Sequence, residues 1–244
     1  MTNSSLKILL LQAREHDDPA RIEEVQSFAI RAEVPADCIT PHNLLDGPPD
    51  RGAVDRFDLI FIGGSGHYYV SRGDLPRQDV FFGELREWVA DKKPIFASCF
   101  GFQCLVEALG GSIVYDPKSM EVGTHELTLT DSGQKDELFC SLPARFFAQL
   151  GHKDRATSLP KGIVNLASSE LSPLQAFRID DTPIWATQFH PELDWETNRD
   201  RFIRYLDGYA AHMSEVEQQE LLEAYHDSPE SNQLLVQYLR LVFS

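Results

Sequence analysis

Cys99 lies where an apolar run gives way to a segment with helical spacing. Residues 94–98 predict a buried strand, and residues 100–109 predict a helix that Gly110 ends. A cysteine on such a turn projects beyond the edge of the sheet, as in a nucleophile elbow. The free N–H groups of a helix N-terminus stabilise a thiolate, and the N–H of Phe100 can point at a developing oxyanion. We therefore predict that Cys99 is a nucleophile, with a buried core cysteine as the plain alternative.

The other cysteines lack this setting. Cys104 lies one helical turn further on with no turn residues around it, so we expect it in the core. The four cysteines form no CxxC pair and have no spacing typical of a metal site: Cys38, Cys99, Cys104 and Cys140. We expect reduced thiols and a cytoplasmic protein.

His190 is the candidate for the base that such a thiol needs. It follows the strand-like run 185–189 and precedes Pro191 and Glu192. Residues two apart on a strand face the same side, so the Glu192 carboxylate can approach the imidazole, fix its tautomer and stabilise its charged form. A His-Pro-Glu tripeptide alone also fits an ordinary strand end. Together with Cys99 at the same sheet edge, it predicts a Cys-His-Glu triad.

Two glycines follow another predicted strand. Gly63 and Gly64 come directly after residues 58–62, and glycine lets a backbone N–H approach a bound carbonyl. If this strand neighbours the one before Cys99, the glycines lie beside the thiol. A simple strand-ending turn explains them equally well.

The elements that must position these residues alternate along the chain. Short apolar runs predict strands at residues 6–11, 58–62 and 94–98, and helical spacing predicts helices at 18–32, 78–91 and 100–109. This order is typical of a parallel sheet with helices on both faces. Further on, alternating segments predict strands, some of them antiparallel, at residues 124–130, 144–150, 162–169, 173–179 and 182–193.

The end of the chain is predicted to be helical from about residue 198, with a fresh helix start at residues 228–230. We find no repeat and no linker rich in Gly, Ser or Pro. We therefore expect a single α/β domain over residues 1–244, with a core of about 6–207 and a helical C-terminal extension of about 208–244.

Composition excludes several classes of function. The chain has 244 residues and a net charge of -16, which argues against binding to nucleic acid or to anionic membranes. No apolar run reaches the roughly 18 residues of a membrane helix, and the N-terminus lacks a signal-peptide pattern. No phosphate-binding GxxxxGK[ST] loop and no metal-ligand cluster appears. We expect no cofactor and no metal.

The motifs together resemble the class I (triad) glutamine amidotransferase family. The resemblance is greatest to free-standing members similar to the glutaminase domain of GMP synthase, and it extends from about residue 6 to about 205. It rests on residues 99–103 (CFGFQ), 188–192 (QFHPE) and 63–64 (GG), with residues 108–111, 121–123 and 151–154 in the family's order. Four positions depart from the family's usual residues: Ser65, Ala97, Phe102 and Gly151.

This resemblance implies a flavodoxin-like three-layer α/β sandwich and a γ-glutamyl thioester on Cys99. It implies that the triad Cys99, His190 and Glu192 is catalytic. It further implies two groups of supporting residues: Gly64 and Phe100 as oxyanion donors, and Gln103, Gly151 and His152 near the amino-acid end of the substrate.

Three functions remain open at this point. The first is a glutaminase that passes ammonia from glutamine to a synthetase partner. The second is a free-standing γ-glutamyl hydrolase or peptidase, in which the loop 66–76 lines the leaving-group side with His67, Tyr68 and Tyr69. The third is a non-catalytic binding or regulatory protein, which the complete triad disfavours. The small-molecule substrate is glutamine or another γ-glutamyl amide, and a homodimer stays open.

Overall fold

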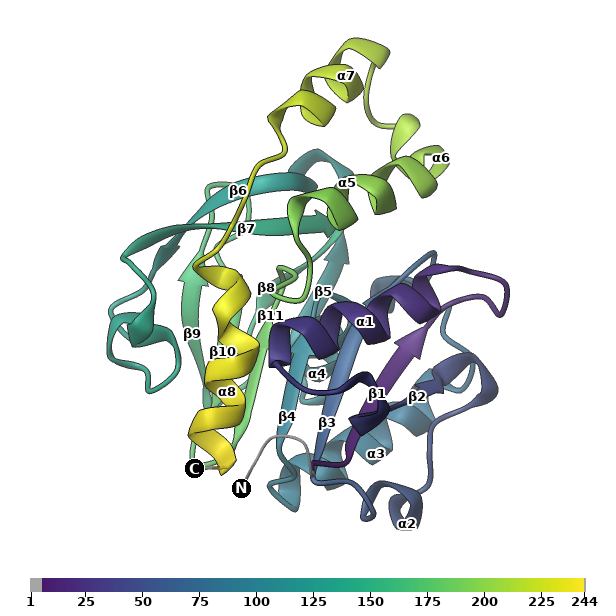
Figure 1. The fold of residues 1–244 in the computed structure, drawn as a ribbon, viewed down its shortest axis with the longest axis vertical. Coiled ribbons are helices and arrows are strands. Elements are labelled where there is room, and N and C mark those ends of the chain that lie inside the picture. The colour runs from purple at the N-terminus through teal and green to yellow at the C-terminus, as the bar shows by residue number, and fades with distance from the viewer. Residues whose placement is uncertain (1–5, 244) are drawn as a thin grey trace.

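A nine-stranded sheet forms the centre of the computed structural model, which describes residues 6–243 (Figure 1). The strand order in these residues is β2-β1-β3-β4-β11-β10-β9-β6-β7. The strands are β1 (Ile8–Ala13), β2 (Ile39–Asn43), β3 (Leu59–Ser65), β4 (Ile95–Ser98), β6 (Glu121–Leu129), β7 (Arg145–His152), β9 (Ile163–Ser168), β10 (Ala176–Ile179) and β11 (Ile184–Thr187). The first five strands of this order, β2, β1, β3, β4 and β11, are parallel to one another. The remaining neighbours in the sheet pair antiparallel. The predicted sheet, mostly parallel at its centre with added antiparallel strands, is confirmed.

Helices cover both faces of the parallel strands, which explains their apolar sequences. Along β1, Ile8 and Leu10 enter one buried cluster, while Leu9 and Leu11 enter the other. Each face therefore has its own core, as a three-layer sandwich requires. The first core packs against α1 (Ala20–Ala32) and α8 (Leu234–Phe243), and the second against α3 (Gln78–Ala90) and α4 (Phe100–Ala108).

Shorter elements complete the chain. The remaining helices are α2 (Arg51–Val54), α5 (Trp195–Arg204), α6 (Leu206–Ala210) and α7 (Glu215–Ala224). A separate antiparallel pair joins β5 (Ser112–Tyr115) to β8 (Asp154–Ser158). Turns of 3₁₀ helix lie at Ala36–Cys38, Leu44–Asp46, Val70–Arg72, Pro117–Ser119, Gly133–Lys135, Phe139–Ser141 and Ser231–Gln233.

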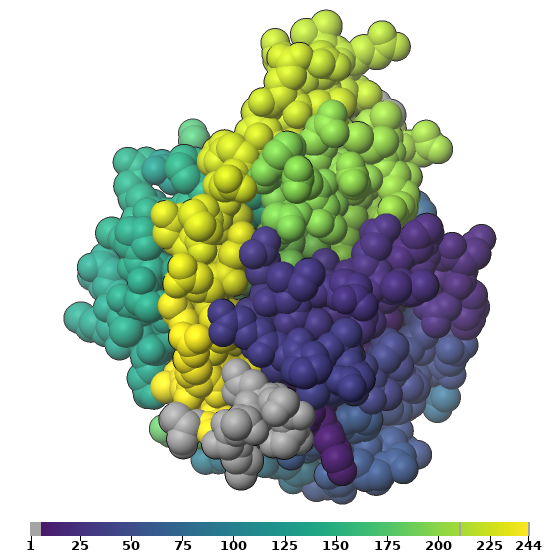
Figure 2. Space-filling view, viewed as in Figure 1, coloured from purple at the N-terminus to yellow at the C-terminus, as the bar shows by residue number. Residues whose placement is uncertain are grey.

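The C-terminal segment packs on the body of the same chain. Helix α8 lies beside α1, and its residues Leu234 and Tyr238 are fully buried in the first core (Figure 1). It begins at Leu234, after a 3₁₀ turn, and so later than the helix start expected at residues 228–230. Helix α7 forms a projection at one end of the molecule (Figure 2). None of the helices in the described residues is long and apolar enough to cross a membrane.

Candidate functional site

Cys99 occupies the turn between β4 and α4 in a backbone conformation that is rare for a residue with a side chain. Its φ is 48° and its ψ is -99°. The turn is held because the Cys99 N–H donates to the Thr187 carbonyl of β11 at 2.8 Å. Gly101 lets α4 approach β3, since a Cβ there would lie 2.7 Å from the carbonyl oxygen of Ile62. The neighbouring strands thus hold the thiol in a strained elbow.

His190 and Glu192 come to the same edge because β11 runs parallel to β4. The two residues lie beyond the end of β11, in a turn in which the Leu193 N–H donates to the His190 carbonyl at 3.3 Å. They are therefore not paired by strand spacing, as the sequence suggested. His190 Nδ1 nevertheless lies 2.6 Å from Glu192 Oε1, and both side chains are buried.

The imidazole of His190 is held in its charged form. Burial alone lowers its pKa, but the charges of Glu192 and Cys99, with hydrogen bonds to both, raise that pKa to about 10. The charge of Cys99 contributes to this rise, and the thiol and the imidazole line the same cavity. The three predicted triad side chains are therefore brought together.

Gly64 lies beside His190, and β3 neighbours β4 as the sequence argument required. A Cβ on Gly64 would lie 3.0 Å from His190 Cε1, so a glycine here lets the imidazole sit close. The Gly64 N–H donates to Glu24 Oε1 at 3.2 Å in this structure. Phe100 is the first residue of α4, and the N–H groups of a first turn have no partner within the helix. The oxyanion roles of Gly64 and Phe100 stay predictions.

The three residues expected near the amino-acid end of the substrate line the same cavity as the thiol. Gln103 donates through Nε2 to the Asp154 carbonyl at 3.1 Å. His152 Nε2 lies 3.2 Å from Glu121 Oε2. Burial opposes ionisation of Glu121, but the hydrogen bond and the charge of His152 lower its pKa. The carbonyl of Gly151 accepts from Tyr209 Oη at 3.1 Å.

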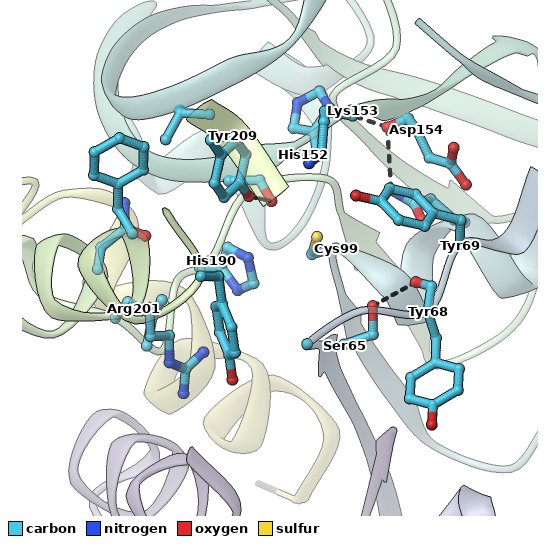
Figure 3. Close-up of a pocket in the computed structure, with 18 of the residues that line it drawn as sticks. Ser65, Tyr68, Tyr69, Cys99, His152, Lys153, Asp154, His190, Arg201 and Tyr209 are labelled. Atoms are coloured by element: carbon cyan, nitrogen blue, oxygen red, sulfur yellow. Dashed lines mark hydrogen bonds between the residues drawn. The ribbon is translucent and has the colours of Figure 1, made fainter. Parts of the chain in front are cut away.

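The loop after the glycines contributes part of the cavity wall. Ser65, Tyr68 and Tyr69 line the cavity, and Ser65 Oγ donates to the Tyr68 carbonyl at 2.6 Å (Figure 3). Tyr68 and Tyr69 thus line the cavity, and their place on the leaving-group side stays a prediction. His67 instead packs edge-on against Tyr205, with 5.3 Å between the ring centroids, and does not line the cavity.

Sequence reasoning missed the cations around the cavity. Lys153 Nζ donates to the Gly208 carbonyl at 2.6 Å and lies 4.2 Å from the Tyr209 ring centroid. Burial, followed by the charge of Arg72, lowers the pKa of Lys153 to about 8. The lysine lies within the 151–154 motif, but Tyr209 lies more than 50 residues further along the chain, and no pattern connects the two.

The sequence analysis also missed a buried ion pair that lies beside the candidate site. Arg14 Nη2 donates to Glu24 Oε1 at 2.9 Å, and both side chains are almost fully buried. Burial opposes ionisation of Glu24, but the charges of Arg14 and Arg201, with hydrogen bonds from Arg14 and Gln12, lower its pKa. The same carboxylate accepts from Gly64, so the ion pair fixes the backbone beside His190. Among the described residues, no cluster of three or more His, Cys, Asp or Glu side chains could hold a metal ion.

Comparison with known proteins agrees with this arrangement. The family model of glutamine amidotransferase class-I matches residues 55–206. A GMP synthase [glutamine-hydrolyzing] of Thermosipho africanus is 37% identical over 110 residues, which is 45% of this chain and 20% of that protein. The corresponding protein of Thermotoga petrophila is 29% identical over 157 residues, 64% of this chain and 28% of that protein. The match thus spans about a fifth to about a quarter of these relatives' lengths.

Solved structures share the fold. A glutamine amidotransferase from Thermotoga maritima superposes with a TM-score of 0.74 at 19% identity, covering 98% of this chain and 99% of its own. A glutamine amido transferase from Methylobacillus flagellatus gives 0.73 at 19% identity, covering 97% and 95%. The similarity extends over nearly the whole chain, which confirms the flavodoxin-like fold class.

Proposed function

Because this chain belongs to the class-I glutamine amidotransferase family, we propose that it hydrolyses the γ-amide of glutamine or of another γ-glutamyl compound. The reaction uses Cys99 as nucleophile, His190 as acid and base, and Glu192 as the group that orients His190. The observation that carries the proposal is that the elbow thiol and His190 line one cavity, with the buried Glu192 carboxylate 2.6 Å from the imidazole.

The chemistry has two halves. The Cys99 thiolate attacks the γ-carbonyl carbon, a C–S bond forms, and the carbonyl oxygen becomes an oxyanion. His190 then gives its proton to the leaving nitrogen as the C–N bond breaks, which releases ammonia or an amine and leaves a γ-glutamyl thioester. In the second half, His190 accepts a proton from water, the water oxygen attacks the thioester, and glutamate and the free thiol result. Glu192 orients His190 in both halves and stabilises the imidazolium whenever His190 carries the extra proton.

The supporting residues act on the two ends of the substrate. The N–H groups of Phe100 and Gly64 stabilise the oxyanion, and for Gly64 this requires that its N–H exchange Glu24 for the substrate oxygen. Gln103, Gly151 and His152 hold the amino-acid end, in line with their place among the residues that line the cavity.

The first setting for this activity is a complex in which a synthetase partner accepts the ammonia. The relatives are GMP synthases that hydrolyse glutamine, and most of their length lies outside the match. The chain itself supplies the glutaminase portion in this setting.

A second setting, hydrolysis by the chain alone, is favoured by the walls of the cavity. Tyr209 of α6 bonds to Gly151, and the backbone beside it binds Lys153, so the C-terminal segment closes over the cavity. Tyr68 and Tyr69 add aromatic surface on another wall. Such walls offer contacts to a γ-glutamyl substrate larger than glutamine.

The test is a release assay with the purified chain alone. Glutamate and ammonia or amine are measured with glutamine and with a panel of γ-glutamyl amides, and Cys99→Ala serves as the inactive control. We expect release that requires Cys99 and no ATP. A chain that is silent alone and becomes active only with a synthetase favours the first setting, and a chain that is silent under both conditions refutes the proposal.

A further inference from the structure

Arg201 on α5 is a buried cation whose hydrogen-bonding groups are unused. Its side chain is 7% exposed and lines the same cavity as Cys99 and His190. Within the described residues, Nε, Nη1 and Nη2 of Arg201 all lack a hydrogen-bond partner. A guanidinium has five N–H donors, and leaving a buried charged group without hydrogen bonds is costly.

The nearest carboxylate cannot satisfy this guanidinium. Arg201 Nη1 lies 3.9 Å from Glu24 Oε1, which is an ion pair but not a hydrogen bond. A carboxylate has about four acceptor sites. Those of Glu24 already accept two hydrogen bonds from Arg14 and one each from Gln12 and Gly64. Glu24 therefore offsets the charge of Arg201 and leaves its donors free.

The position of Arg201 indicates which end of a substrate it meets. The attack by Cys99 requires that His190 give a proton to the leaving nitrogen, so the leaving group lies on the His190 side of the thiol. In Figure 3 the Arg201 side chain lies on the His190 side of the cavity, whereas His152 and Lys153 lie across from it. The guanidinium is thus separated from the wall to which we assign the amino-acid end.

The chemistry of the donor set indicates the class of ligand. A guanidinium presents its donors as a planar fork that matches a carboxylate in a bidentate contact. Such a contact would use donors that the protein leaves free.

We propose that Arg201 binds the carboxylate of an amino acid leaving group, so that the preferred substrates are γ-glutamyl amino acids. This inference rests on the proposed function. The reaction is the one described above: the γ-glutamyl C–N bond breaks, His190 protonates the amino acid nitrogen, and water converts the thioester to glutamate. One water is consumed, and glutamate and a free amino acid are released.

A matched pair of substrates isolates the carboxylate. γ-Glutamylglycine and γ-glutamylglycinamide have nearly the same size, and only the first carries a negative charge on the leaving group. We expect a kcat/KM about 10- to 100-fold higher for γ-glutamylglycine, the range for a hydrogen-bonded charged contact. Arg201→Gln should remove this preference, so that the two substrates have about the same kcat/KM.

Two further variants serve as controls for misfolding and for the loss of any arginine on this helix. Arg201→Lys keeps a positive charge near Glu24 but loses the planar fork, so it should fold even if Arg201→Gln does not, and it should keep only part of the preference. Arg204→Gln is the matched control on the same helix, because Arg204 pairs with Glu23 at 2.7 Å on the surface. It should leave both substrates unchanged.

Binding to a Cys99→Ala background separates this inference from the proposed function. Calorimetry with the intact dipeptide and its amide should show at least about tenfold tighter binding of the dipeptide, lost in Cys99→Ala/Arg201→Gln. Equal binding and equal turnover of the two substrates would overturn the inference while glutamine hydrolysis upholds the proposed function. An equal loss for glutamine and both peptides in Arg201→Gln would also overturn it. If the equal loss comes from a higher KM, Arg201 binds the substrate's own α-carboxylate. If the equal loss comes from a lower kcat with a shifted pH profile, Arg201 instead positions Glu192.

Discussion

Replacing Glu24 by alanine should destabilise the protein far more than the same change at its neighbour Glu23. Glu24 is fully buried, and its carboxylate accepts two hydrogen bonds from Arg14. Without it, Arg14 keeps a hydrogen bond to Tyr205 and a 3.9 Å contact with Asp18. A buried cation is then left largely uncompensated. Removal of one partner of a buried ion pair costs about 3–5 kcal/mol of the free energy of unfolding.

Glu23 provides a matched control, one residue away on α1. It also pairs with an arginine, Arg204, at 2.7 Å, but the two side chains are 38% and 29% exposed. Pairs with this much exposure contribute about 0–1 kcal/mol because water and salt screen them. We therefore expect Glu24→Ala to lower the free energy of unfolding by about 2–5 kcal/mol more than Glu23→Ala.

Urea unfolding at neutral pH measures this difference, provided that both variants unfold with the slope of the wild type. The pH dependence gives an independent check. Although burial opposes it, the charge of Arg14 lowers the pKa of Glu24, so this stabilisation is present above the ordinary value of 4.5 and is lost as the pH falls through the lower folded value. The wild type should lose more stability on acidification than Glu24→Ala does. Equal costs for the two alanine variants would refute the argument from burial.

Three changes in the cavity test the assigned roles. Cys99→Ser should abolish hydrolysis with an unchanged urea midpoint. Mass spectrometry after limited iodoacetamide treatment should show Cys99 labelled before the other three cysteines, and labelling of another cysteine first would contradict the role of Cys99 as nucleophile. His190→Ala should reduce kcat by several orders of magnitude and Glu192→Gln by less, because the imidazole can still reach the thiol; near-full activity in His190→Ala would contradict the triad. Gly64→Ala places a Cβ 3.0 Å from His190 Cε1 and should reduce kcat by about 10- to 100-fold, whereas Gly83→Ala, whose Cβ would have only a 3.9 Å contact, should not.

The sequence revealed two kinds of strand: apolar runs buried on both faces, and alternating segments that form β6, β7, β9, β10 and β11. β1, β3 and β4 are predicted because a parallel strand covered by helices is a continuous apolar run. β2 was missed because it lies at the edge of the sheet, contains Pro41 and buries only its two end residues. β5 was missed because it is short, with one buried residue and an irregular register.

The residues of the site likewise fall into those that the sequence could predict and those that it could not. Cys99, His190 and Glu192 could be proposed because each sits in a local motif whose backbone geometry can be inferred from a few neighbouring residues. Arg14 and Arg201 could not, because their partners come from other elements and nothing in their immediate surroundings marks them as buried. The helical spacing of α1 predicts that its polar residues face solvent, yet Glu24 in this helix is fully buried.

Sheet order explains why the distant and the local parts of the site meet. Strands β1, β3, β4 and β11 are consecutive and parallel, so their carboxyl ends lie at one edge. Cys99 is at the centre of this edge, and its strained turn depends on both neighbours of β4: Thr187 of β11 accepts its N–H, and Ile62 of β3 packs against Gly101. A turn that is strained by itself persists only where its surroundings determine it from two sides. Loosening either neighbour should therefore relax the elbow, and activity should fall before the fold does.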